Sequence, residues 1–235
     1  MSSRFHAITF DVASPEVVAA FWAGLLGREV VPDAGGRLLP GSPTQVGLRF
    51  EANPDPPEAE ERVHLHVTSS SPEDQQRVIA TALDLGASHL DVGQLPEEGH
   101  VVLADPAGDP FCVIEPGNNF LAGCGLLGEL ACDGTREVGL FWAAALGWPL
   151  VWDENEETAV QAPEGGTKVA WGGPPVAPQH GRSRQRFELM ADDAGGLAAE
   201  VERLVGLGAT VLREGDGEVA LADVDGTEFR IRPLS

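Results

Sequence analysis

The sequence predicts an α+β protein built from four copies of a strand–helix–strand unit. Two observations support this: Leu-Gly pairs recur at nearly constant spacing, and each pair closes a stretch with helical apolar periodicity. The pairs are Leu26-Gly27, Leu85-Gly86, Leu146-Gly147 and Leu207-Gly208, with glycines 59, 61 and 61 residues apart. Because glycine adopts the left-handed conformation after a helix without a Cβ clash, we interpret each pair as a helix end.

Four helices are expected, over residues 15–26, 72–85, 135–146 and 194–207. Ser14 is suited to cap the first helix and Pro15 to occupy its first position, and Ser71 repeats the cap before the second helix. The apolar stripes of the first and third helices include Phe21 and Phe141. We therefore expect both phenylalanines to be buried between helix and sheet.

A strand is expected before each helix, over residues 5–12, 63–68, 126–131 and 186–190. Further strand-like runs separated by Gly, Pro and Asp cover residues 46–50, 101–104, 111–115, 169–171, 219–222 and 229–232. The repeated unit is therefore one strand, one helix and two or three more strands, a βαβββ module present four times.

A longer repeat groups the modules in pairs. Phe21-Trp22-Ala23 and Phe141-Trp142-Ala143 lie 120 positions apart, and the turn Asp105-Pro106-Ala107-Gly108 matches Asp223-Val224-Asp225-Gly226. We therefore predict two domains, residues 1–117 with modules 1 and 2 and residues 118–235 with modules 3 and 4. Each domain has an ordinary size for an independent core.

The composition restricts the environment and the partners. The net charge of −22 repels phosphate backbones and anionic lipid heads, so nucleic acid and membrane partners are not expected. No apolar run is long enough to cross a bilayer, and because the first residues contain no apolar stretch, we expect no secretory signal. The three cysteines, Cys112, Cys124 and Cys132, form no CxxC pair, which favours free thiols in a reducing cytoplasm.

Several segments resemble a known family. The strings over residues 20–27 and 140–147 resemble the first helix of glyoxalase-like domains, residues 102–112 resemble their terminal hairpin, and residues 62–66 resemble the strand that opens their second module. The chain is thus similar to the vicinal oxygen chelate superfamily, of the glyoxalase/bleomycin-resistance type. The resemblance implies a tandem pair of glyoxalase-like domains with cup-shaped cavities, a small-molecule ligand, and a monomer or homodimer.

The resemblance also implies where a divalent metal would bind in active relatives: a His or Glu on the first strand, a His on the strand opening the second module, and a Glu on the last strand. By position, these fall on Ala7, His64 and Cys112 in the first half. Alternation along a strand places His66 on the face of His64, and Thr9 and Asp11 on the face of Ala7. A metal bound by His64 and His66 is one interpretation; a polar, metal-free pocket is the other.

In the second half the corresponding positions are Leu127, Arg186 and Arg230. Arginine stays protonated and cannot ligate a metal, so no metal is expected there. Arg186 and Arg230 could instead bind an anionic ligand or form ion pairs across the strands. Three tryptophans could stack on a flat ligand or belong to the core: Trp148, Trp152 and Trp171.

Three functions follow as hypotheses. The first is a metal-free small-molecule binder, and the second is a metal-dependent lyase, isomerase or dioxygenase acting in the first-half cup. The third is a pseudo-enzyme whose second half only supports the first. In each case we expect four side chains to converge on one cavity of the first half: Thr9, Asp11, His64 and His66.

Overall fold

The chain is described by a computed structural model covering residues 3–56, 62–95, 97–176, 183–191, 196–215 and 217–234. The first module contains β1 (Arg4–Val12), α1 (Pro15–Leu26), β2 (Val31–Asp33), β3 (Gly36–Leu39) and β4 (Gly47–Ala52). The second contains β5 (Val63–Val67), α2 (Pro72–Asp84), β6 (Ser88–His89), β7 (Val101–Ala104) and β8 (Pro110–Val113). The third contains β9 (Leu127–Cys132), α3 (Arg136–Leu146), β10 (Leu150–Glu154), β11 (Glu157–Gln161) and β12 (Lys168–Trp171). The fourth contains β13 (Gln185–Ala191), α4 (Gly196–Gly206), β14 (Thr210–Gly215), β15 (Glu218–Ala222) and β16 (Glu228–Pro233).

The four predicted βαβββ modules are therefore confirmed, although six strands lack a clear sequence signal: β2, β3, β6, β10, β11 and β14. Most of these strands are short or lie at a sheet edge. Nearly all residues of β10 and all residues of β14 are exposed, so no alternation between apolar and polar residues marks these two strands. The predicted start of the fourth helix, residues 194–195, lies outside the described residues.

The helix ends follow the Leu-Gly prediction. Gly27 and Gly147 have φ of 65°, and Gly86 and Gly208 have φ of 108° and 116°, all in the region that favours glycine. The predicted caps differ from one another. The Ser71 hydroxyl accepts a hydrogen bond from the amide of the third helical residue, whereas Ser14 occupies the cap position without a side-chain bond.

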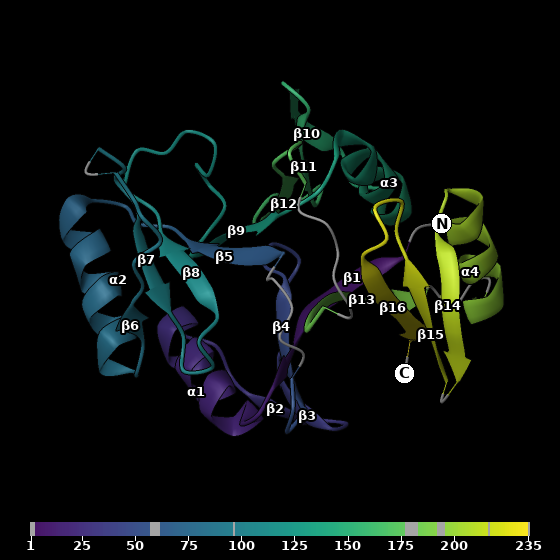
Figure 1. Ribbon diagram of the computed structural model, residues 1–235, viewed down its shortest axis with the longest axis horizontal. Helices are drawn as coiled ribbons and strands as arrows, with labels where there is room; N and C mark the ends of the chain where they lie inside the picture. Colours follow the sequence, from purple (N-terminus) through teal and green to yellow (C-terminus); the bar gives the residue numbers. More distant parts are fainter. Residues whose placement is uncertain are drawn as a thin grey trace.

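The sixteen strands form two eight-stranded sheets, each shared by both halves of the chain. Sheet I combines modules 1 and 4 in the order β14-β15-β16-β13-β1-β4-β3-β2, and sheet II combines modules 2 and 3 in the order β10-β11-β12-β9-β5-β8-β7-β6. The central contacts are antiparallel pairs of opening strands, β1 with β13 and β5 with β9. In Figure 1 these four strands cross the middle of the molecule, with α1 and α2 on the left and α3 and α4 on the right.

The helices tie together the modules of one half. Trp22 of α1 packs on Phe111 of β8 and donates a hydrogen bond to Asp105 at 3.0 Å. Trp142 of α3 makes the matching bond to Asp223 at 3.1 Å. Phe21 and Phe141 are both buried, as predicted. These equivalent environments support a duplicated half. Each half is therefore held by helix packing, while each sheet joins the two halves.

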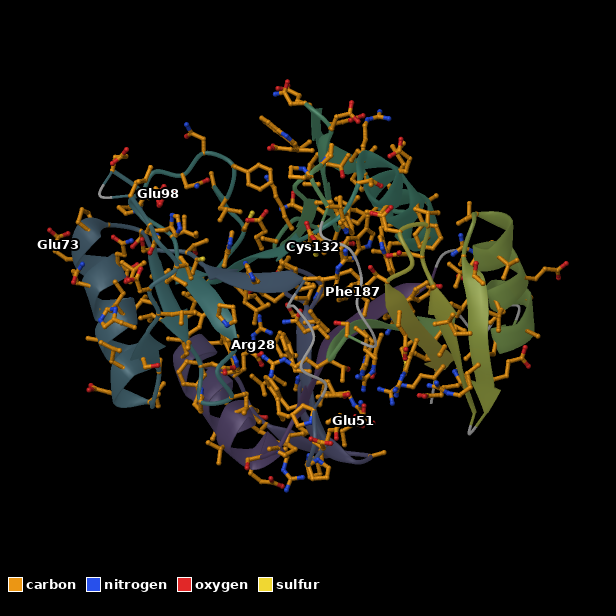
Figure 2. All side chains as sticks on the ribbon, viewed as in Figure 1. Arg28, Glu51, Glu73, Glu98, Cys132 and Phe187 are labelled. Atoms are coloured by element: carbon orange, nitrogen blue, oxygen red, sulfur yellow. The ribbon has the colours of Figure 1, made fainter. Side chains whose placement is uncertain are left out.

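Two glutamine side chains connect the sheets. The Gln185 amide in β13 accepts from Val63 N and donates to Val63 O, both at 2.9 Å, and so extends the hydrogen bonding of β5. Gln45, just before β4, donates to Cys124 O at 2.8 Å. Between the sheets lies apolar core, and Figure 2 shows Cys132 of β9 and Phe187 of β13 close to the centre of the molecule. All three cysteines are buried and free, as expected.

None of the helices in the described part of the chain has the length and apolar character that crossing a bilayer requires.

Candidate functional site

Each sheet has one face packed on helices and an opposite face, here called its cup face. Along the strands the two faces alternate. In β5, for example, Val63, Leu65 and Val67 belong to the apolar core, so His64 and His66 lie on the cup face. In β1 the core holds Ile8 and Phe10, so Thr9 and Asp11 lie on the cup face, as the sequence predicted.

The structure does not bring these four residues together. Thr9 and Asp11 lie on β1 of sheet I, and His64 and His66 lie on β5 of sheet II. The expectation of one cavity lined by all four is therefore wrong. The reason is that each opening strand pairs with a strand from the other half, β1 with β13 and β5 with β9, rather than the two modules of one half sharing a sheet.

On sheet II a row of polar side chains crosses four adjacent strands. His66 lies opposite Cys112 of β8 on one side and Glu129 of β9 on the other, and Glu129 lies opposite Lys168 of β12. His66 Nδ1 is 2.7 Å from a Glu129 carboxylate oxygen. Two residues predicted for a site, His66 and Cys112, are thus brought together, and two that the sequence reading missed, Glu129 and Lys168, complete the row.

The Glu129 carboxylate and the Cys112 thiol control the charge of His66. Burial by itself would lower the pKa of this imidazole, but the hydrogen bonds to Cys112 and Glu129 outweigh burial and raise the pKa to about 9. His66 is therefore protonated at neutral pH and paired with Glu129. Its ring nitrogens then both act as hydrogen-bond donors.

Part of the sheet II cup is covered by the segment that links β8 to β9. Leu121 and Cys124 of this segment pack with Cys112 in a small apolar cluster separate from the main core. The uncovered part lies over β9, β10, β11 and β12 and contains a cavity of about 380 Å³. The cavity is lined by Phe120, Glu129, Ala131, Cys132, Trp152, Glu157, Thr158, Ala170, Trp171 and Gly172. Trp152 thus lines the second-half part of a cup. Trp171 borders the same cavity but belongs to the apolar core, and Trp148 lines a different groove, beside Phe5.

The sheet I cup is filled by ion pairs. Buried Arg186 pairs with Asp11 at 2.6 Å and also contacts Glu51. Arg230 pairs with Glu218 at 3.1 Å and lies 3.7 Å from Glu51. Glu51 is labelled in Figure 2 on β4, below the centre of the molecule. The structure therefore places the two predicted arginines in a network with carboxylates of the same face.

Arg49 extends this network across sheet I. It bonds Glu188 at 3.1 Å and also pairs with Asp33, and Arg232 bonds the other oxygen of Glu188 at 3.1 Å. Thr9, fully buried, lies in register between Arg49 and Arg186. Each of these cations has a carboxylate beside it, although Nε of Arg186, Arg230 and Arg232 has no hydrogen-bond partner among the described residues.

Neither cup offers a favourable donor set for a metal. Within the described residues no group of three or more His, Cys, Asp and Glu side chains is placed to hold one ion. In sheet II, His66 and Glu129 bind each other, and Lys168 lies opposite Glu129 on the next strand. His64, two residues before His66 on the same strand, is exposed. In sheet I, arginines flank Thr9. Metal binding by His64 and His66 thus remains a prediction based on two residues.

The repeat contains a signal for Glu129. Leu127, the expected first-strand position of the second half, belongs to the apolar core, and a register shift lies between it and the pair His66–Glu129. Glu129 corresponds to Thr9 at the 120-residue repeat distance. Lys168 had no comparable signal, since the pairing of β12 with β9 joins residues about 40 positions apart.

The comparisons with known proteins agree with this architecture. The profile of the Glyoxalase-like domain matches the chain twice, over residues 7–114 and 129–232. Glyoxalase I from Zea mays superposes with a TM-score of 0.69 at 15% identity, covering 98% of this chain and 92% of its own. A putative dioxygenase from Bacillus subtilis subsp. subtilis str. 168 superposes with a TM-score of 0.59 at 16% identity, covering 99% and 86%.

No curated protein matches the chain in sequence. At these identities the solved structures show a shared fold, and the two profile matches together span most of the sequence. The chain therefore belongs to the glyoxalase-like domain family, within the vicinal oxygen chelate superfamily.

Proposed function

We propose that this protein binds a small organic molecule in the cavity of the sheet II cup, without a bound metal ion. The carrying observation is the cavity of about 380 Å³, which combines apolar walls with the carboxylate of Glu129 beside His66. Ligand sites typically have this character: mostly apolar, concave, and fitted with a few polar groups that orient the ligand. On the cup face of sheet I, by contrast, the described residues place buried charged side chains such as Arg186 and Asp11.

Ligand-observed NMR with a library of small organic molecules tests the proposal. We expect the wild type to bind members of the library, and Ala170→Glu to lose them, because the new side chain enters the cavity from its floor. The matched control is Ala20→Glu, since Ala20 is exposed on α1. Binding that survives Ala170→Glu, or a library without any ligand, would contradict the proposal.

The alternative is a metal-dependent lyase, isomerase or dioxygenase that uses the same cup. It is favoured by the pairing of His66 with Glu129, two side chains that can ligate a metal when His66 is neutral. Metal analysis of the protein after mild purification and dialysis separates the two functions. We expect well under one ion per chain; a stoichiometric metal that disappears in His66→Ala would establish the alternative.

A monomer is the assembly that we propose. Both eight-stranded sheets are completed by strands of a single chain, so no partner is needed to close either cup. Light scattering coupled to gel filtration should give the mass of one chain. The mass of two chains at low micromolar concentration would instead show a homodimer.

A further inference from the structure

Alanines form part of the floor of the sheet II cavity. Along one line of paired residues, His64 lies opposite Ala131, Ala131 opposite Ala170, Ala170 opposite Ala159, and Ala159 opposite Trp152. All five therefore share the cup face of five neighbouring strands. Of the three alanines, Ala131 and Ala170 line the cavity, whereas Ala159 is fully buried. Because these two lie on neighbouring strands, roughly 4.8 Å apart, and each side chain is a single methyl group, they form a low, apolar part of the floor.

An aromatic wall stands at one end of this floor. Trp152 is 37% exposed, although it lines the cavity, and its ring meets the Phe120 ring edge to face with centroids 5.8 Å apart. Phe120 is held by Lys168, whose ammonium lies 4.0 Å from the ring centroid and donates to the Phe120 carbonyl. A partly exposed indole beside the apolar floor of Ala131 and Ala170 offers stacking area to a ring system in the cavity.

The polar edge of the cavity consists of hydrogen-bond acceptors. Glu129 lines the cavity, and its hydrogen bond with His66 involves the Oε2 atom. The Oε1 atom can therefore accept a hydrogen bond from a ligand. Glu157, a second carboxylate, lines the same cavity. The cationic group of Lys168 is directed to Phe120. A ligand that presents a donor is therefore matched to this edge, whereas an anionic group would face two carboxylates.

We infer that the cavity takes a planar fused-ring aromatic molecule that lies on the alanine floor and directs a hydroxyl or amine donor toward Glu129. This inference rests on the proposed binding function and adds the class of ligand. It follows from the low apolar floor beside the partly exposed Trp152 indole, which suits a planar ring system, and from the acceptor edge, which selects the donor.

Three probes with one carbon skeleton test the inference: 2-naphthol, 2-methoxynaphthalene and decahydro-2-naphthol. Calorimetric titration of the wild type should show 2-naphthol binding at least about tenfold more tightly than either analogue. The methoxy compound cannot donate to a carboxylate, and a hydrogen bond to a charged group accounts for roughly this factor. The saturated compound keeps the hydroxyl but cannot lie flat on the floor or stack on Trp152.

Variants connect the probe to the floor. Ala170→Leu places a larger side chain on the cavity floor and should weaken the binding of 2-naphthol at least about tenfold. Ala20→Leu, on the exposed face of α1, should leave that binding unchanged. Unfolding curves for both variants establish that the folded state is retained. Equal binding of 2-naphthol and its methyl ether would overturn the donor edge, and equal binding of the saturated alcohol would overturn the preference for a planar ring.

The two proposals fail in different ways. If 2-naphthol does not bind but other library molecules bind and are lost in Ala170→Glu, the binding function stands and the aromatic class is wrong. If neither the probes nor the library bind, both proposals are wrong.

Discussion

At three positions that correspond in the repeat, the two cup faces carry different chemistry: sheet I has Arg186, Asp11 and Glu51, and sheet II has His64, Ala131 and Ala170. In sheet I the three side chains form a buried ion-pair cluster. In sheet II, Ala131 and Ala170 line a cavity, and His64 is exposed. Module duplication therefore fixed the backbone of both cups, while substitutions on one face determined whether the cup is filled by its own side chains or left open.

The largest expected effect comes from converting the open cup into the filled one. The triple variant His64→Arg, Ala131→Asp, Ala170→Glu transfers the sheet I cluster to sheet II. Ligand binding in the cavity should fall by roughly 100-fold or more, because charged side chains would occupy the floor. Calorimetric titration of both proteins with a ligand found for the wild type measures this loss of affinity. Undiminished binding would show that the ligand does not use this floor.

Core variants compare the two halves away from the cups. Phe21→Ala and Phe141→Ala should each destabilise the protein by about 3–5 kcal/mol, because both rings are buried at equivalent places beside a Trp–Asp bond. Urea unfolding gives the two free energies. Similar losses would show that the cores of the two halves are equivalent, so that the difference lies between the two cup faces. A loss below about 1 kcal/mol for either variant would contradict the burial.

The filled cup can be opened by removing its central cation. Arg186→Met leaves Asp11 and Glu51 without their main partner and should cost roughly 3–5 kcal/mol in unfolding free energy. Adding Asp11→Ala and Glu51→Ala, the residue type found in sheet II, should recover part of that loss. If the triple variant is less stable than the single variant, the carboxylates stabilise the face independently of Arg186.

The matching Trp–Asp turns should differ in pH dependence. Burial, with a smaller contribution from Asp109, raises the pKa of Asp105 to about 7, and burial raises the pKa of Asp223 to about 6. For a carboxyl group with a raised folded-state pKa, the contribution to stability is present below the unfolded pKa and disappears as pH rises through the folded value. Deprotonation of Asp105 should thus lower the free energy of unfolding by up to about 4 kcal/mol as the pH rises from about 4 to about 7.

Asp105→Asn should abolish that part of the pH dependence, and Asp223→Asn should abolish a smaller part that ends near pH 6. Urea unfolding of the wild type and both variants at several pH values measures the slopes. A wild-type slope that persists in Asp105→Asn would show that the carboxyl is not the titrating group.

The smallest effect is expected at Thr9. Its hydroxyl is buried and has no hydrogen-bond partner among the described residues, so Thr9→Val should change the unfolding free energy by no more than about 0.5 kcal/mol. Thr167→Val is the matched comparison, because the Thr167 hydroxyl donates a hydrogen bond to Leu127 O at 2.8 Å. Loss of this hydrogen bond should lower the unfolding free energy by about 1–3 kcal/mol. A large loss in Thr9→Val would reveal a polar role for Thr9.

By itself, the sequence determined the repeated module, the four helices and the faces on which individual side chains lie. These features follow from local periods of 2 and 3.6 residues and from glycine conformation, as at Gly27 and Gly147. Tertiary structure alone decided which modules share a sheet. The four opening strands have similar patterns, so pairing β1 with β5 or with β13 would bury the same kind of surface. That long-range choice separated Thr9 from His66 and placed Glu129 and Ala131 beside the histidines, which is why the composition of the site could not be derived from spacing alone.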